Sequence, residues 1–151
     1  MRGYFGIGVE NISKAGNLGN LMRSAHAFGA SFFFTINDAI DMSELAATDT
    51  SSSPAHMPFY RHASIKELQL PRTCMLVGIE LLNDAVDLPN FQHPLQAAYI
   101  LGPEKGSLSD EVVRACKFTV KIPTKFCVNV GVAGALVMYD RMLSQRIGPR
   151  T

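Results

Sequence analysis

Short apolar runs alternate along this chain with segments of helical periodicity, and the alternation predicts an α/β fold. The runs predicted to form strands are Tyr4–Val9, Ser31–Ile36, Cys74–Leu82, Ala97–Leu101 and Phe118–Ile122. The segments predicted to form helices are Leu18–Phe28, Ala39–Thr50, Ser64–Leu68, Ser109–Arg114 and Val130–Ser144. Because strands joined through helices run in the same direction, this order predicts a mostly parallel sheet flanked by helices on both faces.

Turn and capping residues predict where several of these elements begin and end. Lys14–Asn20 (KAGNLGN) is predicted to be a loop that enters the first helix, and Gly29 to be the residue that ends it. Ser64, followed three residues later by Glu67, predicts a capping box at the start of a short helix. Thr48–Pro58 is polar and carries two prolines, so it is predicted to be a surface loop.

The composition narrows the class of protein. A length of 151 residues with 47% hydrophobic residues favours one globular domain over residues 1–151. No run approaches the ~18 apolar residues of a membrane span, and the N-terminus lacks a secretory signal pattern. Cys74, Cys116 and Cys127 are odd in number and widely spaced, which favours reduced thiols in the cytoplasm. The histidines show no metal-ligand spacing, so we expect no metal. Because no apolar run is long enough to span a membrane, we also expect no membrane partner.

The charge is unevenly distributed. Residues 1–104 hold six Lys and Arg against ten Asp and Glu, a balance of −4. Residues 105–151 hold eight against three, a balance of +5. One interpretation is a solvated surface whose sign varies along the chain. The other is a local basic patch for a polyanion such as RNA.

The first candidate site comprises Asn11 and the stretch Lys14–Arg23. Its glycines allow a tight turn, Asn17 offers an amide, and the N–H groups of a new helix favour an anion. The guanidinium group of Arg23 could then hold a phosphate bidentately. Alternatively, this is a capped helix whose arginine forms a surface ion pair.

The second candidate site lies in Ile100–Arg141, where two predicted strands run into polar loops. Ligands bind at such strand ends in open α/β folds. Glu104 could be a general base or a rigid hydrogen-bonding strut, and Lys105 beside it favours the strut because it keeps the carboxylate ionised. Asn129 precedes a helix with small residues, and Tyr139 extends the apolar surface of that helix. The helix could therefore pack on the sheet or form an oligomer contact.

These segments resemble, in the same order, the three motifs of the TrmH-like (SpoU) branch of the SPOUT RNA methyltransferases. The first motif is similar to Asn11 with Gly16–Gly29 (GNLGNLMRSAHAFG), and the second to Leu101–Ser109 (LGPEKGSLS). The third is similar to Lys121–Asp140 (KIPTKFCVNVGVAGALVMYD). Asn83–Leu88 (NDAVDL) resembles the stretch between motifs, so the resemblance covers essentially the whole chain.

The resemblance implies an α/β sheet flanked by helices whose C-terminal part forms a trefoil knot. It implies a homodimer that transfers a methyl group from S-adenosylmethionine to a ribose 2′-hydroxyl of tRNA or, as a second choice, rRNA. No RNA-binding domain is appended in residues 1–151, so the compact domain, as a dimer, would itself hold the RNA.

The resemblance also assigns roles. The implied cofactor-binding residues are Leu81, Leu101, Gly102, Ile122, Cys127 and Val128. The implied substrate-binding residues are Asn11, Lys14 and Arg23, and the implied catalytic residues are Arg23, Asn17, Glu104 and Asn129. Because an arginine stays protonated, we expect Arg23 to fix a phosphate and stabilise a developing alkoxide rather than remove the proton. Asn17 and Asn129 would position loop and substrate, and Glu104 would brace the knot.

The chain departs from the family pattern in its third motif. Cys127 and Gly131 stand where relatives commonly carry serine, and Thr124 stands where they carry methionine. The missing hydroxyls leave open a second interpretation, a knotted RNA-binding protein or RNA chaperone with weakened catalysis.

Overall fold

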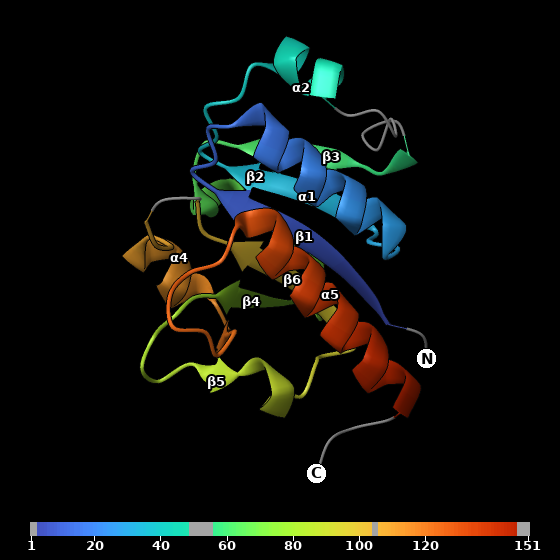
Figure 1. The fold of residues 1–151 in the computed structure, drawn as a ribbon, viewed down its shortest axis with the longest axis vertical. Helices are drawn as coiled ribbons and strands as arrows, with labels where there is room; N and C mark the ends of the chain where they lie inside the picture. Colours follow the sequence, from blue (N-terminus) through green and yellow to red (C-terminus); the bar gives the residue numbers. More distant parts are fainter. Residues whose placement is uncertain (1–2, 49–55, 104–105, 148–151) are drawn as a thin grey trace.

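Within residues 3–48, 56–103 and 106–147, which the computed structural model describes, seven parallel strands form one sheet (Figure 1). Their order is β3-β2-β1-β6-β4-β7-β5. The strands are β1 Tyr4–Glu10, β2 Phe32–Ile36, β3 Phe59–His62, β4 Met75–Ile79, β5 Val86–Asp87, β6 Gln96–Leu101 and β7 Phe118–Lys121. The helices are α1 Ala15–Ala27, α2 Met42–Thr48, α4 Asp110–Ala115 and α5 Val130–Ile147, with 3-10 helices η1 Ile65–Glu67 and η2 Leu88–Asn90.

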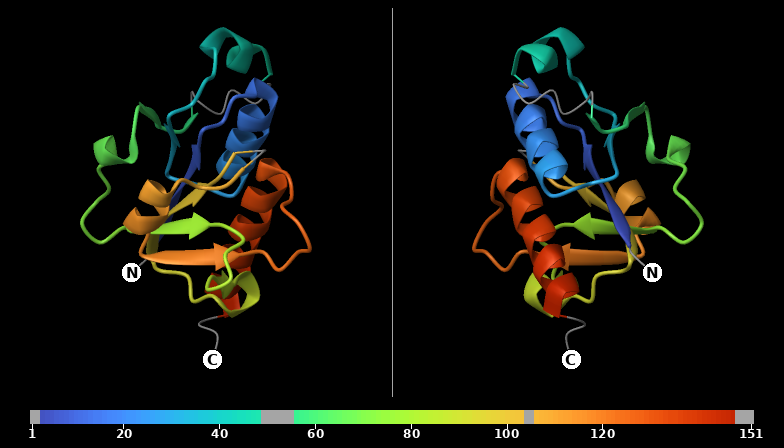
Figure 2. Two further views of the ribbon diagram at one scale, coloured as in Figure 1. Left: turned by 90° about the vertical axis from the view of Figure 1, so that its left-hand side faces the viewer. Right: turned by 90° about the vertical axis from the view of Figure 1, so that its right-hand side faces the viewer.

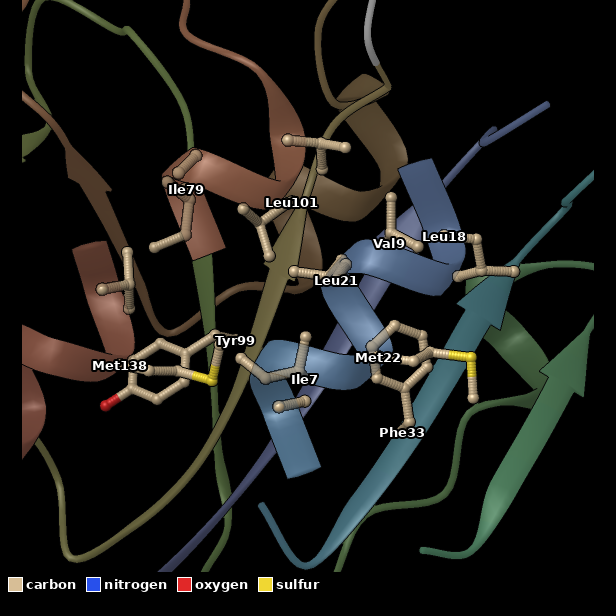
Figure 3. Close-up of a cluster of buried hydrophobic side chains, with 14 of the residues drawn as sticks. Ile7, Val9, Leu18, Leu21, Met22, Phe33, Ile79, Tyr99, Leu101 and Met138 are labelled. Carbon is tan, nitrogen blue, oxygen red and sulfur yellow. The ribbon is translucent and has the colours of Figure 1, made fainter. Parts of the chain in front are cut away.

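Helices lie on both faces of the sheet, as the sequence pattern predicts. Figure 2 shows α1 and α5 on one side and α4 on the other. Under α1 and α5, apolar side chains such as Ile7, Leu21 and Met138 are almost fully buried (Figure 3). A second cluster, which includes Phe34 and Val112, fills the opposite face. None of the helices among the described residues has the length and apolar character needed to cross a membrane.

Close contact between α1 and α5 depends on a small residue. A Cβ built at Gly134 of α5 would lie 2.3 Å from Cδ1 of Leu21 in α1. Leu21 is fully buried, so a larger residue at position 134 would have to displace a core side chain. Gly134 therefore sets how closely the two helices approach.

The strand order reverses at one edge of the sheet. β7 pairs with β4 on one side and with β5 on the other, although β5 precedes it in the chain. The segment 80–85, which joins β4 to β5, therefore passes across β7. The backbone N–H of Glu80 in this segment donates to the carbonyl of Val120 at 2.9 Å.

Arg141, a buried residue of α5, fastens the helix to the amino-terminal edge of the sheet. Its guanidinium is 2.7 Å from the carbonyl oxygen of Pro94, 2.8 Å from that of Leu95 and 3.3 Å from that of Tyr4. It also donates to the hydroxyl of Tyr99 at 3.0 Å. The residue is 2% exposed, and these acceptors compensate the burial of its charge.

Tyr99 connects this arginine to a buried histidine. Its hydroxyl accepts from Arg141, so its proton can point to Nδ1 of His93, 2.6 Å away. Nε2–H of His93 can then donate to Asp140 at 2.7 Å. Burial raises the pKa of Tyr99 to about 12, so the hydroxyl stays a donor at neutral pH. With a neutral histidine, each hydrogen bond in the series Arg141–Tyr99–His93–Asp140 therefore has one donor and one acceptor.

The observed boundaries correct several predictions. Helix α1 begins at Ala15, so Asn17 lies in its first turn and not in an entry loop. Gly29 ends the helix with a φ of 83°, as predicted. Helix α2 begins only at Met42, because an Asp41 side chain accepting from Ser43 N–H starts it there. Most of the loop predicted over Thr48–Pro58 lies outside the described residues.

The predicted capping box at Ser64 is wrong. The segment is a 3-10 helix, and the Ser64 side chain makes no capping bond. Glu67 instead reaches the N–H of Ala63 at 3.2 Å. Two short strands, β3 and β5, were not predicted because their residues do not form apolar runs and their strand geometry comes from pairing with β2 and β7.

Replacing Tyr99 by phenylalanine should destabilise the fold. The substitution leaves buried groups of Arg141 and His93 without their shared hydroxyl, so the free energy of unfolding should fall by about 1–3 kcal/mol. Urea denaturation measures the change. Tyr60→Phe is the control, since Tyr60 is 52% exposed. Equal stability of the two variants would show that the hydroxyl of Tyr99 adds nothing to the fold.

Candidate active site

The carboxyl ends of β4, β6 and β7 border a cleft of about 510 Å³, measured out to its open mouth. The cleft is lined by Ile79–Leu81, Leu101–Pro103, Gly106, Ile122, Thr124, Cys127, Val128, Val130 and Ala133. The structure thus brings together all six residues that the sequence assigns to cofactor binding, and their role in binding stays a prediction.

The wall after β6 leaves little room for a side chain at position 102. A Cβ there would lie 3.2 Å from the backbone nitrogen of Leu108 and 3.4 Å from the carbonyl carbon of Ser107. These contacts are backbone contacts, which cannot move as a flexible side chain can. Gly102 therefore lets the returning loop close on the end of β6.

Two buried carboxylates hold this returning loop. Glu80 is 8% exposed, and its Oε2 accepts from the N–H of Leu108 at 2.6 Å. Glu10 is 5% exposed, and its Oε1 accepts from the N–H of Ser109 at 2.7 Å. β1 and β4 flank β6, so the two carboxylates hold the loop from both sides.

Burial, with a contribution from the charge of Glu10, raises the pKa of the Cys116 thiol to about 12, which keeps it protonated.

The loop between β7 and α5 is braced by its threonine. The hydroxyl of Thr124 is 2.8 Å from the carbonyl oxygen of Phe126 and 3.3 Å from that of Ile122. This tight turn leaves the Phe126 side chain 75% exposed. Cys127 is also exposed, at the mouth of the cleft.

Asn129 links the two candidate sites. Its Oδ1 accepts from the N–H of Gly131 at 2.8 Å and from that of Val132 at 3.4 Å, so it caps α5. Its Nδ2 donates to Oδ1 of Asn17 in α1 at 3.3 Å. The first turns of the two helices therefore meet beside the cleft, and the predicted residues Asn17 and Asn129 are in direct contact.

The other predicted substrate residues lie on the exposed side of this junction. Lys14 and Arg23 are exposed, at the start of α1 and two turns along it. A Cβ at Gly131 of α5 would lie 3.7 Å from the Cβ of Asn20, which is one helical turn before Arg23. Arg23 thus follows the place where α1 meets the start of α5.

Asn11 belongs to a second polar junction, at the ends of β1 and β2. It accepts at Oδ1 from the side chain of Asn37 at 2.8 Å, and both residues have positive φ, 58° and 51°. Asp38 follows directly. Burial raises the pKa of Asp38, but hydrogen bonds from Arg61 and Thr35 outweigh it and hold this pKa below its usual value. The ionised carboxylate fixes the chain next to Asn37.

Within the described part of the C-terminal third, the basic side chains do not form a single patch. Arg141 is buried, and Lys121 lies 3.9 Å from Asp87. Lys117 precedes β7 and Arg146 lies near the end of α5, both away from the carboxyl edge. Near the cleft, the exposed cations of the described chain include Lys14, Arg23 and Lys125.

Glu104 lies outside the described residues, so its predicted catalytic or bracing role stays a prediction. Glu10 and Glu80, which do brace the loop, were not singled out from the sequence. The signal was present, because each carboxylate stands at the end of an apolar run. Among the described residues, no group of His, Cys, Asp and Glu could hold a metal ion.

The model of the SpoU rRNA Methylase family matches residues 5–139. The chain is 26% identical over 160 residues to the 23S rRNA (uridine(2479)-2′-O)-methyltransferase of Streptomyces viridochromogenes. The alignment covers 98% of this chain and 55% of that protein, so the chain spans about half the length of this curated relative.

Solved structures share the fold. The SpoU methyltransferase AviRb from Streptomyces viridochromogenes superposes with a TM-score of 0.85 at 24% identity, over 98% of this chain and 62% of that one. The same enzyme in complex with AdoMet gives 0.84 at 22% identity, over 98% and 63%. A structure described as "Structural insights into the 2-OH methylation of C/U34 on tRNA" gives 0.77 at 24% identity, over 98% of this chain and 94% of that one.

Asn129→Ala and Asn129→Asp should separate the two functions of this side chain. Alanine removes the cap of α5 and should lower the free energy of unfolding by about 1 kcal/mol. Aspartate keeps the capping oxygens but cannot donate to Asn17, so its stability should stay within about 0.5 kcal/mol of the wild type. Urea denaturation of both variants is the measurement. Equal destabilisation by the two substitutions would contradict the capping role.

Proposed function

Since the chain belongs to the SpoU rRNA Methylase family, we propose that it is an RNA ribose 2′-O-methyltransferase. The methyl donor in this proposal is S-adenosylmethionine. The observation that carries the proposal is the Asn17–Asn129 contact, which joins the cleft at the strand ends to the helix that bears Arg23. A donor in the cleft and an acceptor at α1 would then meet beside one helix junction.

The cleft suits a nucleoside cofactor in chemistry. Its walls are mostly apolar, as flat heterocycles require, and Leu81, Leu101 and Ile122 are among its lining residues. When bound, S-adenosylmethionine supplies an activated methyl group on a sulfonium. The protein then mainly has to orient the accepting hydroxyl.

Arg23 is the residue we assign to the acceptor. It stays protonated at neutral pH, so it cannot serve as an unaided base. Its fork can hold a phosphate of the RNA bidentately and stabilise negative charge that develops on the ribose oxygen. Lys14 adds an exposed cation at the start of the same helix, and Asn11 adds an exposed amide.

The RNA that we propose is tRNA, with rRNA as the second candidate. One similar structure is described by the words "2-OH methylation of C/U34 on tRNA", and the similarity extends over 94% of that protein. The match to the 23S rRNA enzyme extends over 55% of its relative. Residues 1–151 would act as one domain, and the expected cytoplasmic location stays part of the proposal.

The proposal includes the trefoil knot that the family resemblance implies. Two features support it. Segment 80–85 crosses β7 on its way from β4 to β5, and the chain after β7 returns as α5 to pack on α1. The cofactor cleft would lie within the loops of this knot.

A homodimer is the final part of the proposal. Helix α5 carries three exposed apolar side chains on one face: Val132 at 50%, Leu136 at 41% and Tyr139 at 49%. Their spacing of four and three residues places them on one stripe. Such a stripe beside the catalytic junction would be covered by the same helix of a second copy.

Arg23→Ala should reduce methyl transfer to tRNA by about 10²–10³-fold, because it removes the charge that stabilises the acceptor oxygen. The measurement is transfer of labelled methyl from S-adenosylmethionine to unmodified tRNA, with circular dichroism to check the fold. Arg72→Ala is the matched control, since Arg72 is exposed in the turn before β4, at the opposite edge of the sheet.

Full activity of Arg23→Ala would contradict the role assigned to Arg23. Wild-type protein that binds tRNA but transfers no methyl group would favour the non-catalytic alternative. Transfer to rRNA and not to tRNA would replace the first substrate by the second.

Leu136→Glu should convert the dimer to a monomer, because it places a charge in the middle of the apolar stripe. Sedimentation velocity measures the change. Met42→Glu is the control, since Met42 is equally exposed, at 40%, but lies on α2. A dimer that survives Leu136→Glu would place the interface elsewhere.

A further inference from the structure

Glu80 is the acidic side chain among the described residues that line the cleft. It is 8% exposed and stands among apolar neighbours, between Ile79 and Leu81. Burying a carboxylate in such surroundings is costly unless hydrogen bonds compensate it. The hydrogen bonds of the Glu80 carboxylate therefore decide whether its burial is compensated.

Its carboxylate has acceptor capacity to spare. Oε1 accepts from the N–H of Leu81 at 3.2 Å, and Oε2 accepts from the N–H of Leu108 at 2.6 Å. An ionised carboxylate offers about four acceptor positions, so about half of them are taken by these two bonds. Because Glu80 is among the residues that line the cleft, the remaining lone pairs are the acceptors that a ligand with hydroxyl or amino donors would meet there.

The topology indicates which half of the cofactor reaches Glu80. The acceptor residues sit on α1, which follows β1, and β4 lies two places from β1 in the sheet, beyond β6. The transferable methyl group must point toward α1 and its junction with α5. The nucleoside half then lies toward β4 and β7, where Glu80 is.

We propose that Glu80 accepts hydrogen bonds from the ribose hydroxyls of the nucleoside cofactor. Two adjacent hydroxyls are donors at a spacing that one carboxylate can accept, and an acidic side chain after a strand performs this task in dinucleotide-binding folds. The inference rests on the proposed function, because it takes the ligand of the cleft to be S-adenosylmethionine. It adds a cofactor-recognition residue with the chemical group that it recognises.

The competing interpretation is that Glu80 only holds the loop at Leu108. Glu10 provides the matched comparison. It is an equally buried carboxylate that binds the next backbone N–H of the same loop, at Ser109, but it is not among the cleft-lining residues. A loop-holding role predicts similar behaviour of the two glutamates, whereas ribose recognition predicts a difference that depends on the ligand.

Calorimetric titration of the wild type, Glu80→Gln and Glu10→Gln tests the inference. The probes are S-adenosylhomocysteine and its 2′-deoxy and 3′-deoxy ribose analogues. Glu80→Gln should weaken binding of the parent ligand about tenfold to a hundredfold, as expected for hydrogen bonds to a charged group. The loss should shrink to a few-fold for at least one deoxy analogue, and Glu10→Gln should affect all three ligands alike.

The wild type alone gives a second test that needs no folded variant: it should bind a deoxy analogue at least tenfold more weakly than the parent. Equal affinity of the wild type for all three ligands, or the same loss for all three in Glu80→Gln, would overturn ribose recognition. A loss in Glu80→Gln that is far larger for S-adenosylmethionine than for S-adenosylhomocysteine would overturn it in favour of attraction to the sulfonium. A wild type that binds none of the ligands would overturn the proposed function itself.

Discussion

The shape of the cleft depends on hydrogen bonds that two buried carboxylates accept from successive backbone N–H groups. Glu10 at the end of β1 and Glu80 after β4 receive the donors of Ser109 and Leu108. A loop that folds back on a buried strand end leaves such donors without partners, and each orphaned donor costs free energy. The carboxylates remove this cost and tie the loop to the strands on both sides of β6. The loop can then close against Gly102.

Helix α5 is held at two places along its length. At its start Asn129 caps the helix and contacts Asn17, and in its second half Arg141 is bound to carbonyls at the opposite edge of the sheet. One helix therefore transmits the packing of the core to the residues beside the cleft. Binding groups held on such a scaffold lose little freedom when a ligand arrives, which favours both affinity and orientation.

The sequence predicted the elements with strong periodicity, and it grouped the six cleft residues correctly in space. It missed β3 and β5, whose residues become strands only through their neighbours in the sheet. It also overlooked Glu10 and Glu80, which hold the loop at Ser109 and Leu108. A carboxylate after an apolar run does not reveal which backbone donor it will meet, because the donor lies about thirty to a hundred residues away. Long-range pairing of this kind is set by topology.

The position of β7 between β4 and β5 also fixes when the cleft can exist during synthesis. One wall comes from residues 79–81, 101–103 and 106, and the other from Ile122, Thr124, Cys127, Val128, Val130 and Ala133. A nascent chain that has not yet placed β7 and the start of α5 has only half of the cleft. A ligand that needs both walls binds only the completed fold, and by mass action it stabilises that state alone. Occupancy of the cleft thus reports that assembly has finished.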